Sequence, residues 1–194
     1  MTRQYVLILA MTFVLHGCAA ALVPYSSDPD QKLSNAFQLI NHGRPIPAER
    51  LATEALTDYE EKKDYSGAAN AHKVLGILYK SNAYRSFSKY FKEHGGYDPT
   101  NEKSIKHFRE SAEFYKLAGD HWGVSSALVG VGDSYFSEGN NENACKIYKE
   151  SLATYTNPNA VFTGIIHTWN PRYESYQEMV EALVDKACSV QSNT

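Results

Sequence analysis

Two lysines have the spacing best suited to binding chemistry. Lys73 and Lys80 are seven positions apart in the sequence, so on a helix they lie two turns apart along one face. In that arrangement the two ammonium groups could bind a carboxylate or an acidic segment of another molecule. The alternative is that both side chains are simply solvated.

No residue pattern in the sequence indicates catalysis. Neither a Gly-x-Ser-x-Gly turn nor a His-Glu-x-x-His pair is present. The seven histidines are scattered without metal-ligand spacing, and we interpret His107 as an ordinary surface or core residue. Gly130 and Gly132 lack the third glycine of a dinucleotide-binding loop. We therefore expect no enzymatic activity, no catalytic residue, no metal and no cofactor.

Composition limits the class of partner. A formal net charge of −3 argues against nucleic acid, which requires a basic face to neutralise its phosphates. A hydrophobic content of 43% over 194 residues is enough for one domain with a buried core. No small-molecule substrate is evident, so the expected partner is another protein or a peptide.

The N-terminus has the pattern of an export signal. Arg3 precedes eleven apolar or weakly polar residues at 5–15, well short of the roughly 20 that a spanning helix needs. The following Leu-His-Gly-Cys resembles a bacterial lipobox, which implies cleavage before Cys18 and acylation of that cysteine. Ala19 resembles the outer-membrane sorting pattern of enteric-type lipoproteins. Ordinary secretion and an uncleaved anchor are the alternatives.

A repeated line of sequence indicates paired helices. GDHWGVSSALVGVGDSY at 119–135 matches KDYSGAANAHKVLGILY at 63–79, at an offset of 56 residues. Small residues on the expected helices form two sets. The spacings are 40 and 56 in the first set, Ala36, Gly76 and Gly132, and 56 and 40 in the second, Ala48, Ser104 and Ala144. A period of 40 residues, with 16 extra residues between the two helices of the middle unit, explains both sets.

These residues resemble the tetratricopeptide repeat. LGILY at 75–79 and VGDSY at 131–135 match the family's Leu-Gly-x-x-Tyr, and Gly139, Ala144 and Tyr148 match its turn glycine, small residue and aromatic. The resemblance implies an all-α fold, a short solenoid of about three helix pairs with an insertion in the middle unit and a capping helix at the C-terminus. An irregular helical bundle is the alternative.

The expected organisation follows from these signals. We predict a signal peptide at 1–17, a tether at 18–29, repeats over 30–158, and a loop with the capping helix at 159–194. The repeat units cover 30–62, 66–117 with an insertion at 81–101, and 122–156.

In the tetratricopeptide family the first helices of the units line a concave groove that binds other proteins. Carried over by position, the predicted groove consists of Phe37, Asn70, Lys73, Ile77, Lys80, Asp133 and Phe136.

The insertion is a second candidate surface, with the aromatic residues Tyr84, Phe87, Tyr90, Phe91 and Tyr97 and the basic residues Arg85, Lys89 and Lys92. The spacing of the aromatics predicts that the first helix of the middle unit continues through about residue 93. The insertion would contact a partner, touch lipid headgroups or fold back onto the repeats.

Two cysteines remain beyond Cys18. Cys145 falls on the last repeat helix and Cys188 on the capping helix, which should be neighbours. An exported compartment permits a disulfide between them, and two buried thiols are the alternative.

Together these features predict a lipid-anchored, periplasm-facing scaffold or assembly factor of a bacterial envelope machine, of the secretion or pilus type. The membrane would be the outer one, reached through the lipid. The alternative function is an immunity lipoprotein that binds and neutralises a toxic effector, such as a phospholipase delivered by a type VI system.

Overall fold

The computed structural model describes residues 26–162 and 170–189, and the regular structure in this part of the chain is entirely helical. The all-helical expectation is therefore confirmed there. Cys18 and the predicted signal peptide lie outside the described residues. The helices are α2 (Pro29–Asn41), α3 (Pro45–Lys62), α4 (Tyr65–Lys80), α5 (Asn82–Ser86), α6 (Ser88–Glu93), α7 (Glu102–Ala118), α8 (His121–Ser137), α9 (Asn141–Tyr155) and α10 (Tyr176–Ser189).

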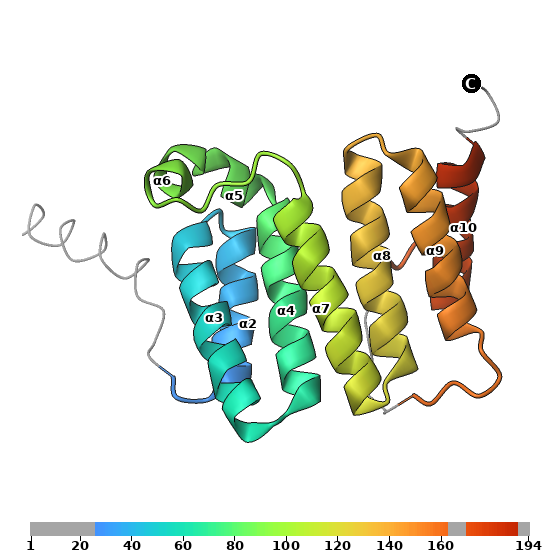
Figure 1. Ribbon diagram of the computed structural model, residues 1–194, viewed down its shortest axis with the longest axis horizontal. Helices are drawn as coiled ribbons and strands as arrows, with labels where there is room; N and C mark the ends of the chain where they lie inside the picture. Colours follow the sequence, from blue (N-terminus) through green and yellow to red (C-terminus); the bar gives the residue numbers. More distant parts are fainter. Residues whose placement is uncertain (1–25, 163–169, 190–194) are drawn as a thin grey trace, which may run out of the picture.

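The long helices stand side by side in a row (Figure 1). α2 packs on α3, α4 on α7, and α8 on α9, while α10 packs against α9 at one end of the row. α2 also touches α4, and α4 touches α8, so the first helices of successive pairs adjoin one another. Buried apolar side chains form three clusters along this row. Each pair thus buries its apolar face against its neighbours.

The duplicated sequence line encodes one local structure twice. Asp64 begins α4 and accepts a hydrogen bond from the Gly67 amide at 2.9 Å, and Asp120 begins α8 and accepts one from the Gly123 amide at 3.1 Å. These are N-caps, in which a carboxylate satisfies an amide that has no partner within the helix. The caps set where the first helix of each of these two pairs begins.

Glycine allows the helices of the middle pair and the last pair to approach closely. An added Cβ on Gly76 would lie 2.9 Å from the Phe108 ring, and one on Gly132 would lie 2.5 Å from the Tyr148 ring. In the middle pair the Ser104 hydroxyl also donates to the Gly76 carbonyl at 2.9 Å. The small residues singled out in the sequence therefore lie at helix–helix contacts.

The insertion departs from the expectation of one continuous helix through about residue 93. α4 ends at Lys80, because Ser81 is extended at ψ 152° and its hydroxyl accepts from the Tyr84 amide to begin α5. α5 and α6 then lie across the ends of α2 and α3 (Figure 1). Serine, a good N-cap, breaks the helix that the aromatic spacing had suggested.

α10 packs against the pair formed by α8 and α9. Val180 and Ala187 are fully buried, and the Tyr176 hydroxyl lies 3.0 Å from the Ser125 hydroxyl of α8. None of the described helices combines the length and apolar character needed to cross a membrane.

Candidate functional site

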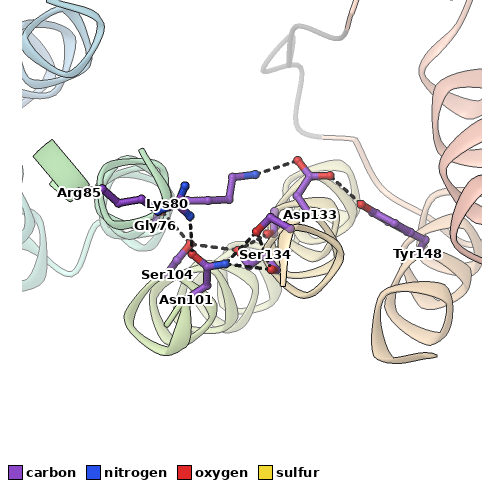
Figure 2. A network of polar contacts seen from close by, with 10 residues as sticks. Gly76, Lys80, Arg85, Asn101, Ser104, Asp133, Ser134 and Tyr148 are labelled. Atoms are coloured by element: carbon purple, nitrogen blue, oxygen red, sulfur yellow. Dashed lines mark hydrogen bonds and ion pairs between the residues drawn. The ribbon is translucent and has the colours of Figure 1, made fainter. Parts of the chain in front are cut away.

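A polar site forms where α4, α8 and α9 meet. Lys80, the last residue of α4, donates to one Asp133 oxygen at 3.0 Å, and the Tyr148 hydroxyl donates to the other at 2.8 Å. Figure 2 shows the two side chains reaching Asp133 from opposite sides. Burial and the adjacent carboxylate raise the pKa of Tyr148, which keeps its hydroxyl a donor. Asp133 is thus held in one orientation by two elements.

Asn101 fixes the end of the insertion to α8. Its side-chain amide donates to the Ser134 carbonyl at 3.1 Å and to the Ser137 hydroxyl at 2.8 Å, and its carbonyl accepts from Arg85 at 3.2 Å (Figure 2). The backbone N–H of Asn101 donates to the Glu138 carboxylate at 2.6 Å. This buried asparagine therefore links Arg85 to α8.

A cavity of about 330 Å³ opens beside these groups, and we call it the cationic pocket. Its lining combines three cations with a single carboxylate and three apolar or aromatic walls. The ammonium of Lys186, from α10, lies 4.7 Å from the centre of the Phe136 ring. The lining residues are Lys80, Arg85, Asp133, Phe136, Ser137, Tyr148, Leu183 and Lys186.

The charges of the cationic pocket are not balanced internally. Asp133 pairs with Lys80, and within the described residues neither Arg85 nor Lys186 forms an ion pair with a carboxylate. Two cations are thus left facing the cavity. A pocket of this size with apolar walls and a few convergent charges suits one anionic group attached to an apolar neighbour.

A second cavity of about 530 Å³ lies on the other side of Lys80, between α2, α4 and α5. Ile40 and Ile77 supply its apolar wall, and Ala83 and Ser86 of α5 close one side. Because Lys80 lines both cavities, the two cavities adjoin each other at the C-terminal end of α4.

The predicted groove is only partly available to a ligand. Asn70 accepts from the Tyr115 hydroxyl at 2.6 Å, and Lys73 donates to the Ser126 hydroxyl at 2.8 Å. Withdrawal of the Lys73 ammonium from water lowers its pKa to about 8. Lys80 is paired with Asp133. Both lysines therefore already have partners within the chain, and that they bind a carboxylate together stays a prediction.

The other groove residues differ in exposure. Phe37 is 44% exposed, while Ile77, Asp133 and Phe136 are half-buried. Sequence reasoning missed Lys186, because it belongs to the helix assigned as a cap. It also placed Arg85 on a separate surface, since a fold is needed to bring the insertion and the C-terminal helix together.

Two of the five aromatic residues in the predicted insertion surface are buried. Tyr84 is fully buried and Phe91 is 3% exposed, with ring centres 4.6 Å apart. The Tyr84 hydroxyl donates to the Gly96 carbonyl at 2.8 Å and accepts from the Asp98 amide at 2.7 Å. Tyr84 and Phe91 belong to the apolar cluster that also contains residues of α2, α3 and α4. Phe87 is exposed and Tyr90 is half-buried.

Three side chains with metal-ligand chemistry meet between α4 and α7. The Nδ1 atoms of His72 and His107 are 3.0 Å apart, and Glu110 Oε2 lies 3.1 Å from His72 Nδ1 and 3.7 Å from His107 Nδ1. Burial lowers the pKa of both imidazoles, that of His107 to about 4. The three groups meet without local metal-ligand spacing in the sequence, because His107 and Glu110 are three apart on one helix and the facing helix supplies His72.

The last two predicted site residues are joined. Cys145 of α9 and Cys188 of α10 form a disulfide with a Cα–Cα distance of 5.1 Å.

Comparison with known proteins adds no assignment. No protein-family model matches the sequence, and no curated protein matches it significantly. The function therefore has to be argued from the pocket itself.

Proposed function

We propose that this protein is a lipid-anchored binding scaffold of the bacterial envelope, a short tetratricopeptide-like array that holds an acidic segment of a partner protein. The observation that carries this proposal is the cationic pocket, where Arg85 and Lys186 face a cavity without an internal counter-charge. An aspartate, a glutamate or a terminal carboxylate of the partner would supply that charge.

The geometry favours a peptide over a small anion. The apolar walls from Phe136 and Leu183 suit a side chain next to the carboxylate. The second cavity continues the surface past Lys80, and the exposed Phe37 of α2 extends it further. An extended segment several residues long can contact all of these features, whereas a single anion contacts one.

Binding of a labelled acidic peptide, with glutamate and leucine residues alternating, tests this proposal. We expect backbone resonances at Arg85, Phe136 and Lys186 to shift in NMR spectra, and binding to weaken as salt screens the charges. Replacing the pocket cations in Arg85→Glu/Lys186→Glu should weaken binding at least tenfold, because each charge is reversed at the site.

A charge-matched control separates the pocket from general electrostatics. Lys89→Glu/Lys149→Glu makes the same change in net charge at two exposed lysines outside the pocket, so it should bind like the wild type. Equal weakening in both double variants, or shifts spread evenly over the surface, would refute a specific site.

A further inference from the structure

We propose that His72, His107 and Glu110 bind a divalent transition-metal ion, with zinc as the best match. This site lies between α4 and α7 and shares no residue with the cationic pocket. It does not depend on the proposed binding of an acidic segment.

The spacing of the three donor atoms fits zinc. A tetrahedral zinc ion with bonds of about 2.0–2.1 Å to nitrogen and oxygen sets its ligand atoms about 3.3–3.4 Å apart. The three separations here are 3.0, 3.1 and 3.7 Å. One point can therefore lie within bonding distance of all three donors with only small side-chain adjustments.

Packing holds the donors in these positions. The Phe114 ring stacks on His72 with centres 5.3 Å apart, and the Tyr79 ring stacks on His107 at the same distance. The Ser111 hydroxyl joins α7 to α4 by donating to the Ala69 carbonyl at 2.9 Å. A site on rigid helices whose side-chain rotamers are restricted by neighbours is pre-organised for an ion.

The donor set selects the class of metal. Two imidazole nitrogens and one carboxylate suit zinc and other late transition metals, whereas magnesium and calcium prefer oxygen ligands throughout. His72 is buried, with 7% of its side chain exposed, while 38% of the Glu110 side chain is exposed. The ion would therefore reach the site from the Glu110 side, where a water molecule can complete four-fold coordination.

Nearby charge moderates the affinity. Lys106 Nζ lies 3.9 Å from the other Glu110 oxygen, and its side chain is 70% exposed. Because a solvated lysine can move away, it competes with the ion only weakly. The alternative to a metal site is that hydrogen bonds among the same three groups hold them close together. An experiment has to distinguish a metal site from such a hydrogen-bonded cluster.

Titration of the full-length chain in detergent with zinc, after removal of metal by a chelator, tests the site. Isothermal calorimetry should give one tight equivalent in the wild type, and zinc should raise the thermal midpoint. With Co²⁺ as the probe, visible absorption typical of four-coordinate nitrogen and oxygen ligation should appear. Cys145 and Cys188 offer no thiol to the metal, since they are bonded to each other.

Two variants remove ligands with little change in shape. Glu110→Gln alters a partly exposed residue and should fold normally, and His107→Gln removes one imidazole. Each should weaken zinc binding more than tenfold and abolish the cobalt absorption. Matched controls are Glu113→Gln on the same helix and the exposed His94→Gln, both expected to behave like the wild type.

Two results would overturn the site. Zinc that binds Glu110→Gln and His107→Gln with wild-type affinity must occupy other histidines. A folded wild type that binds neither zinc nor cobalt leaves only the hydrogen-bonded cluster.

Discussion

At the scale of residues, two glycines make the junction between helix pairs possible. A Cβ on Gly67 would lie 2.1 Å from the Tyr59 ring, and one on Gly123 would lie 2.3 Å from the Tyr115 ring. Each tyrosine lies in the last turn of the second helix of one pair and covers the first turn of the next pair. Tyr59 and Tyr115 are 56 residues apart, and so are Gly67 and Gly123. The repeated line of sequence therefore reflects one contact between a tyrosine ring and a glycine backbone that occurs twice.

Substitution of Gly123 by alanine should therefore destabilise the protein. Tyr115 is fully buried and its hydroxyl is bonded to Asn70, so the ring cannot move away without breaking that bond. Overpacking costs about 1–3 kcal/mol or somewhat more, and alanine returns about 1 kcal/mol in helix propensity. We expect a net loss of about 2 kcal/mol, seen in urea denaturation followed by circular dichroism.

Gly96→Ala provides the control for this substitution. Its Cβ would meet only ordinary contacts, the nearest being the flexible end of Lys103 at 3.5 Å. The stability of this variant should stay close to that of the wild type. If Gly123→Ala is equally stable, the ring does not pack on the glycine as described.

At the scale of elements, α10 is joined to the row by a covalent bond as well as by packing. The disulfide closes a sequence separation of 43 residues and joins α10 to α9. α10 also contributes Leu183 and Lys186 to the cationic pocket. The bond therefore connects the stability of the C-terminal helix to the integrity of the proposed binding site.

Loss of this disulfide should lower both stability and binding. Closing a loop of this length contributes about 4 kcal/mol in the chain-entropy model. We expect Cys145→Ser/Cys188→Ser to unfold at markedly lower urea, and amide exchange to accelerate first in α10. The acidic peptide should bind this variant more weakly.

A reductant gives the matching control for the disulfide. It should shift the wild-type transition toward that of the double serine variant and leave the variant itself unchanged. Identical transitions for the oxidised and reduced wild type would mean that packing alone holds α10.

The sequence predicted elements better than sites. Small residues and periodicity are local signals, and the all-helical class that they predicted is confirmed for the described residues. The break at Ser81 was missed because the aromatic spacing fitted one helix equally well. The cationic pocket and the histidine cluster each contain residues from helices that are far apart in the chain. Local spacing in the sequence cannot predict such contacts.

At the scale of the whole molecule, the predicted lipid anchor and the row of helices would have separate tasks. Even fully extended, the chain between Cys18 and Pro29 reaches at most about 40 Å, so an acylated Cys18 would keep the row close to its membrane. Acyl chains bind a bilayer with about 0.8 kcal/mol for each buried CH₂. No described helix is long and apolar enough to span the bilayer in place of the proposed anchor.

Cys18→Ser should therefore move the protein from the membrane pellet to the soluble fraction after export. Cys145→Ser/Cys188→Ser is the matched control, because it also exchanges cysteine for serine but leaves the predicted acylation site intact, and it should stay in the pellet. Fractionation with an alkaline wash, followed by immunoblotting, measures both variants. If Cys18→Ser stays in the washed pellet, the protein is held by an uncleaved signal or by its partner instead of by acylation. Mass spectrometry of the N-terminal peptide separates these two cases, since only an uncleaved signal retains residues 1–17.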